Sequence, residues 1–117
     1  MKLFRRKIIG NEVRTQYDVS GATEHYCRKL FGDSLISTNL VAVKFEPEEM
    51  KPHITEMVHN YEELKNVAEG QKISSVKFMG KYNNSSFSVV LDYGLSLLNI
   101  LTDSEDVTKS LVERIDS

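Results

Sequence analysis

The sequence has a single cysteine, Cys27, so it can form neither an internal disulfide nor a metal site built from several thiolates. No stretch reaches the roughly 18 consecutive apolar residues that a membrane span requires. The basic N-terminus, residues 1–7, lacks the apolar core of a secretory signal. We therefore expect a cytoplasmic protein without a membrane span.

The sequence also lacks the motifs of common catalytic and cofactor-binding sites. It has no Gly-x-Gly-x-x-Gly, Gly-x-Ser-x-Gly or His-Glu-x-x-His pattern, and its six glycines are scattered. His53 and His59 are spaced to lie on different sides of a helix, and so are His25 and Cys27. We therefore expect no cofactor and no metal site. An enzyme is not favoured, although catalytic groups brought together from distant positions leave that alternative open.

What the sequence does have is enough apolar residues for one core. Of its 117 residues 40% are hydrophobic, and the formal net charge is only −2. This composition excludes a disordered chain and indicates a single domain spanning residues 1–117. No internal repeat, low-complexity tract or Pro-rich linker divides the chain.

The clearest local pattern is a hairpin at the N-terminus. Two extended segments, 3–9 and 12–19, meet at Gly10-Asn11, a pair that suits a type II′ turn. This turn predicts a register with Ile9 opposite Glu12, Ile8 opposite Val13, Arg6 opposite Thr15 and Phe4 opposite Tyr17. Arg5, Lys7 and Arg14 then share one face, and Lys7 lies opposite Arg14, a like-charge pair that normally costs stability.

Two further elements follow the hairpin. A helix is predicted over 22–31, with Ser20 as its N-cap and Gly32 ending it in a left-handed conformation. A strand is predicted over 40–45, whose apolar run is typical of a strand covered on both faces.

The segment 46–69 supports two interpretations. Seven apolar residues form a stripe at helical spacing and favour one helix over 52–69 after a turn at 47–51. The stripe consists of Met50, Ile54, Met57, Val58, Tyr61, Leu64 and Val67. The alternative is a strand-like piece over 53–59, followed by a short helix from Asn60, which has capping-box spacing to Glu63. Because the apolar stripe has more matching positions than the capping box, we favour the long helix.

The last third of the sequence predicts a second hairpin, a third strand over 95–102 and a helix over 104–116. Thr102 and Glu105 have capping-box spacing, and Val107, Leu111 and Ile115 form a buried line on that helix. The predicted order is ββ-α-β-α-βββ-α. This order indicates an α+β fold with a mostly antiparallel sheet and helices packed on one face.

The small net charge hides an uneven distribution along the chain. Residues 1–30 carry seven basic and three acidic groups, whereas residues 31–70 carry three basic and eight acidic groups. Such a basic segment is typical of a protein- or nucleic-acid-binding surface, but also of an edge hairpin protected from aggregation. The basic hairpin and the acidic segment could also neutralise each other in the fold.

We therefore predict a small non-catalytic protein-interaction module, such as an adaptor, an inhibitor or an immunity-type antagonist. Its partner-binding surface would use the basic N-terminal hairpin, the acidic helix face, or both. The predicted partner-binding residues are Arg5, Lys7, Arg14, Arg28 and Lys29. A nucleic-acid-binding protein using the same hairpin is the alternative. An uncovered edge strand beside Phe4, or the final strand, leaves homo-oligomerisation open.

Overall fold

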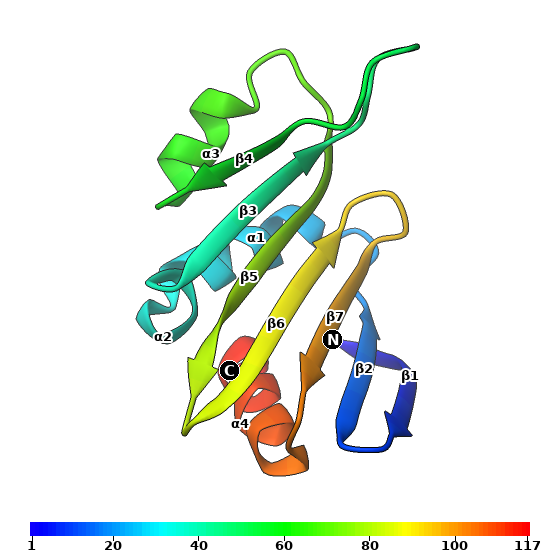
Figure 1. Cartoon of the computed structure of the whole chain (residues 1–117), viewed down its shortest axis with the longest axis vertical. Helices are drawn as coiled ribbons and strands as arrows, with labels where there is room; N and C mark the ends of the chain where they lie inside the picture. Colours follow the sequence, from blue (N-terminus) through cyan, green and yellow to red (C-terminus); the bar gives the residue numbers. More distant parts are fainter.

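A seven-stranded antiparallel sheet forms the centre of the computed structural model, which describes all 117 residues (Figure 1). The strand order is β1-β2-β7-β6-β5-β3-β4. The strands are β1 (Lys2–Ile9), β2 (Glu12–Asp18), β3 (Leu40–Phe45), β4 (Thr55–Val58), β5 (Ile73–Tyr82), β6 (Ser85–Asp92) and β7 (Leu97–Thr102). Its two edges are therefore β1 and β4, whereas β7, the final strand, lies inside the sheet and is not an edge.

The helices pack on one face of this sheet. They are α1 (Thr23–Gly32), α2 (Ser34–Ser37), α3 (Tyr61–Val67) and α4 (Glu105–Asp116). In Figure 1, α1, α2 and α4 lie behind the strands and α3 lies beside β4. The predicted α+β fold with helices on one face is confirmed. None of the four helices is long and apolar enough to cross a membrane.

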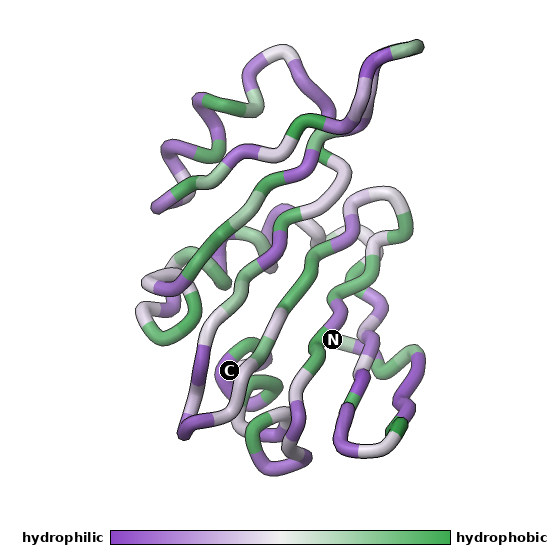
Figure 2. Tube along the Cα trace, viewed as in Figure 1, coloured by the Kyte–Doolittle hydropathy of each residue, from purple (hydrophilic) through white to green (hydrophobic).

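Alternation along the strands builds the core between the two layers. Successive side chains of a strand point to opposite faces, and large apolar residues such as Phe78, Val89 and Leu98 point to the helices, where they are fully buried. The same alternation appears as green and purple bands along the strands in Figure 2. From the helices, Leu30, Leu64 and other apolar residues complete one core cluster.

The N-terminal hairpin forms as predicted, with one difference in register. Gly10 has φ 59°, the positive value that the first position of a type II′ turn needs. Pairing follows the prediction from Ile9 to Arg5, but a β-bulge between Leu3 and Arg5 places Leu3 opposite Tyr17. The predicted pairing of Phe4 with Tyr17 is therefore wrong, because the bulge leaves Phe4 unpaired on a strand with no neighbour beyond it.

The predicted limits of the first helix are nearly right, but both predicted caps are wrong. Ala22 occupies the N-cap position without a side-chain hydrogen bond, and Ser20 instead donates its backbone N–H to the Asp18 carboxylate over 2.8 Å. Gly32 is the last helical residue and is not among the residues with positive φ. The chain leaves α1 through Asp33, whose extended backbone and carboxylate cap the next short helix.

The long helix favoured for 46–69 is wrong, and the alternative is confirmed. This segment contains the edge strand β4 and the short helix α3. The Asn60 side chain accepts a hydrogen bond from the Glu63 N–H over 2.8 Å, and the Glu63 carboxylate accepts one from the His59 N–H over 3.0 Å. The first bond satisfies an N–H group in the first turn of α3, and the second ties Glu63 back to the residue before the N-cap, an arrangement close to a capping box. Met50 and Met57, two residues of the apolar stripe, are exposed.

Three further details differ from the predicted element order. The order ββ-α-β-α-βββ-α omitted α2 and β4. The strand predicted over 40–45 is correct, but it is not covered on both faces, since Leu40 is 55% exposed. The C-terminal helix buries Val107, Leu111 and Ile115 as predicted, and its N-cap is Ser104, which accepts a hydrogen bond from the Val107 N–H.

Candidate functional site

The face of the sheet opposite the helices is free of other elements, and we call it the open face. It consists of the paired strand positions that alternate with the core positions, because paired residues of neighbouring strands point to the same side. One row across the sheet runs Lys7–Arg14–Leu101–Ser88–Met79–Leu40, and the adjacent row runs Arg5–Gln16–Asn99–Val90–Lys77–Ala42. These rows join strands that are far apart in the sequence.

The open face carries mostly positive charge. Its basic side chains are Lys2, Arg5, Lys7, Arg14, Lys44, Lys77 and Lys81, and its carboxylates are Glu12, Asp18 and Asp92. Arg5, Lys7 and Arg14 share this face, and Lys7 lies directly opposite Arg14, as the turn predicted. The chain as a whole has a net charge of −2, so the acidic groups lie predominantly elsewhere.

Most of these cations form no ion pair within the molecule. Arg14 is the exception, because its guanidinium pairs with the Glu12 carboxylate at 3.0 Å. The other six basic residues of the open face form no ion pair, whereas elsewhere Arg6, Lys51, Lys65, Lys72 and Arg114 all do. The acidic segment 46–69 therefore does not neutralise the basic hairpin.

Apolar and uncharged polar groups occupy the centre of the open face. Leu101 and Met79 flank Ser88 in one row. Next to them, the Gln16 side chain donates a hydrogen bond to the Asn99 side-chain oxygen over 2.7 Å. The paired aromatic residues of the strands point to the helices, so the open face lacks the stacking platform on which many single-stranded nucleic acids bind.

Arg28 and Lys29, the other two predicted partner-binding residues, lie on α1 in the helical layer. Arg28 donates a hydrogen bond to the Tyr61 hydroxyl over 3.2 Å, with its guanidinium 5.5 Å from the centre of that ring. Lys29 donates a hydrogen bond to a carbonyl oxygen of Ser117. The structure therefore groups Arg5, Lys7 and Arg14 on one surface but does not place Arg28 and Lys29 with them.

Cys27 is the one candidate nucleophile, and its surroundings oppose that role. Its side chain is fully buried, and burial raises the pKa of the thiol from 9.0 to about 11. Burial also raises the pKa of Tyr93, whose hydroxyl donates a hydrogen bond to the Glu24 carboxylate over 3.3 Å. Both shifts favour the neutral, unreactive forms, whereas a nucleophilic cysteine needs a lowered pKa. No group of three or more His, Cys, Asp or Glu side chains is placed to hold a metal ion.

Four further residues belong to the candidate surface although the sequence did not point to them: Lys77, Met79, Lys81 and Leu101. The alternation of Lys77, Met79 and Lys81 with Val76, Phe78 and Gly80 was visible in the sequence. It places the three residues on one side of a strand. Which strands lie beside this one depends on long-range pairing, which no local pattern records.

Comparisons with protein-family models, with curated proteins and with solved structures found no match for this chain. Its class is therefore defined by the fold and by the open face alone: an α+β protein with a seven-stranded antiparallel sheet, one face of which is free.

Proposed function

We propose that this protein is a non-catalytic interaction module whose open sheet face binds an acidic protein surface. The observation that carries the proposal is the set of six basic side chains on this face that form no ion pair. Complementary charge on a partner would steer the encounter and fix the orientation of the complex. The apolar side chains at the centre of the face would supply the desolvated contact area.

The mixture of residues also favours a protein over a nucleic acid. A nucleic-acid surface relies on phosphate contacts and, for single strands, on exposed aromatic rings. The open face has the basic groups, but its centre holds Leu101, Met79 and Val90 in place of aromatic rings. Aliphatic side chains of this kind pack against aliphatic side chains of a protein partner.

The experiment compares three versions of the immobilised protein in native cell extract, with and without nuclease. The test variant combines Lys7→Glu with Lys77→Glu, which reverses two charges of the open face. The control combines Lys51→Glu with Lys109→Glu, two exposed positions outside the open face, and gives the same total charge. Each is washed at low and at high salt, because screening weakens exposed ion pairs.

We expect an acidic protein that binds the native chain and the control at low salt, fails to bind the test variant, and is released at high salt. Binding that nuclease abolishes would replace the proposal with the nucleic-acid alternative. Equal binding by the test variant and the control, or no specific binding by the native chain, would overturn it.

A further inference from the structure

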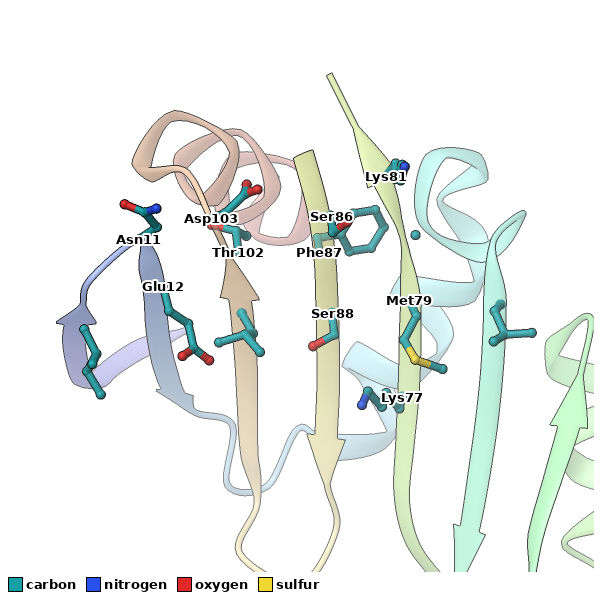
Figure 3. Close-up of a pocket in the computed structure, with 14 residues that line it drawn as sticks. Asn11, Glu12, Lys77, Met79, Lys81, Ser86, Phe87, Ser88, Thr102 and Asp103 are labelled. Atoms are coloured by element: carbon teal, nitrogen blue, oxygen red, sulfur yellow. The ribbon is translucent and has the colours of Figure 1, made fainter. Parts of the chain in front are cut away.

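The open face is hollowed from its centre toward the end that holds the turn between β5 and β6 (Figure 3). The hollow has a volume of about 750 Å³ and lies over β7, β6 and β5, with Ile9 and Glu12 on one side and Leu40 on the other. Its depth has a simple cause: Ser86 and Ser88 on β6 have short side chains, whereas Leu101 on β7 and Met79 on β5 are longer. The strand β6 is therefore the floor of a groove, and its two neighbours form the walls.

The walls of the hollow differ in charge. On the β5 side, Lys77 and Lys81 flank Met79, and neither lysine forms an ion pair. On the opposite side, the Glu12 carboxylate is already paired with Arg14, and Asp103 carries an unpaired negative charge. An anionic group would therefore be attracted to the β5 wall and repelled by Asp103.

The apolar surface of the hollow is exposed in the free protein. Leu101 and Leu40 are 36% and 55% exposed, and Ile9 is 47% exposed. Covering such surface is favourable by roughly 25 cal/mol per Å². The hollow is wide open to solvent, so it suits a segment of a larger partner rather than an enclosed small molecule.

Spacing along β5 defines what would fit. Lys77, Met79 and Lys81 alternate with core residues, so their side chains emerge on one side about 7 Å apart. An extended segment laid along the groove presents its own side chains with the same repeat. Carboxylates at its first and fifth positions would then meet the two lysines, and an aliphatic side chain at the third would meet Met79 and Leu101.

We infer that the hollow binds an extended segment of the acidic partner with the pattern acidic-x-aliphatic-x-acidic. This inference rests on the proposed function and specifies the part of the partner that the open face recognises. The basic residues of β1 and β2 lie outside the hollow's β5 wall and would contact other parts of the partner.

A synthetic peptide tests the inference without the natural partner. The probe is the capped pentapeptide Asp-Ser-Leu-Ser-Asp, and the matched control, Asp-Asp-Leu-Ser-Ser, has the same composition in another order. A third peptide replaces the leucine with serine. Binding is followed by NMR of protein labelled with carbon-13 on its methionine methyl groups, because Met79 lines the hollow and the fully exposed Met50 lies outside it.

We expect the probe to shift the Met79 methyl signal in a saturable way and to leave Met50 unchanged. Binding of the reordered peptide should be up to about fivefold weaker, because it keeps the leucine at its third position but loses the exposed ion pair of the fifth. The variant Ser88→Leu, which fills the floor of the groove, should abolish the Met79 response, whereas Ser88→Ala should retain it. Both substitutions lie on the open face, away from the core, and folding of each variant is checked by its circular dichroism spectrum.

An unshifted Met79 signal, or equal shifts with all three peptides, would overturn the inference. The inference about the hollow can fail while the proposed function holds. If Ser88→Leu still captures the acidic protein from extract while the Lys7→Glu and Lys77→Glu variant does not, the open face binds the partner without using the hollow.

Discussion

Lys7 and Arg14 face each other across the first hairpin, directly opposite in the ladder. Like charges in this arrangement lower stability, and a sequence selected only for folding would not need them. Arg14 is partly neutralised by Glu12, but Lys7 forms no ion pair. A residue pair that costs stability and lies on a free surface is consistent with a binding role.

The substitution Lys7→Glu should therefore stabilise the isolated protein. It replaces a repulsive cross-strand pair with an attractive one, and we expect the free energy of unfolding to rise by about 0.5 kcal/mol. Urea unfolding measures this change. Lys2→Glu is the matched control, because Lys2 lies opposite Asp18 and the substitution should lower stability by a similar amount. A loss of stability in Lys7→Glu would contradict the account of this pair.

Cys27 gives a prediction about pH. Its pKa is raised from 9.0 to about 11 in the folded protein, so the thiol contributes stability that is fully present below pH 9. As the pH rises from 9 to 11, the unfolded chain loses the proton while the folded chain keeps it, and this contribution is lost. This difference in pKa between the folded and the unfolded chain corresponds to about 3 kcal/mol of unfolding free energy.

The measurement compares the native chain with Cys27→Ala at several pH values. The difference in unfolding free energy between them should shrink by about 2 to 3 kcal/mol between pH 8 and pH 11. Tyr17 and Tyr26 also have a raised pKa, but they titrate in both proteins and cancel in the difference. The pKa of Tyr93 is raised by burial and also by Cys27, so the comparison is repeated in a Tyr93→Phe background. A difference that stays constant with pH, or rapid reaction of the native thiol with a labelling reagent, would contradict the burial of Cys27.

At the scale of the elements, Gly32 tests whether α1 ends in a left-handed conformation, because it is the last residue of this helix. Left-handed backbone at a helix end favours glycine, but Gly32 does not have a positive φ, and a Cβ added there would meet no atom within 4 Å. We therefore expect Gly32→Ala to raise the unfolding free energy by about 0.5 kcal/mol, since alanine loses less backbone entropy on folding.

The control is Gly70→Ala. That position also has free space, but φ is +73°, so alanine should destabilise the protein. Thermal unfolding of both variants gives the comparison. Destabilisation by Gly32→Ala would contradict this account and would support the left-handed conformation that the sequence predicted for Gly32.

The elements that the sequence predicted correctly are those with local chemical signals. Gly10-Asn11 predicted the first turn, and Val107, Leu111 and Ile115 predicted the buried side of the last helix. The helix predicted over 52–69 does not form, because helical spacing alone does not bury a residue: Ile54 and Met57 have the spacing but stay exposed. The short signal from Asn60 and Glu63 was the correct one, since the Asn60 side chain caps α3 by accepting a hydrogen bond from the Glu63 N–H.

At the scale of the whole molecule, charge follows the fold rather than the chain. The open face holds seven basic and three acidic strand side chains, which leaves eight basic and fourteen acidic groups for the rest of the protein. The distribution of charge along the sequence indicated a basic surface on the hairpin 1–19, but it did not indicate that Lys44, Lys77 and Lys81 belong to the same surface. These join the hairpin's cations only because the sheet aligns β3 and β5 on the same side as β1 and β2.

The most direct test of the account is site-specific photo-crosslinking in the native cell. A photo-reactive amino acid is placed at Ser88, in the middle of the open face, and in a second protein at Lys109, an exposed position on α4. The account predicts a covalent adduct with an acidic protein from position 88 and none with that protein from position 109. Adducts that form only from position 109, or none from position 88, would contradict the claim that the open face is the binding surface.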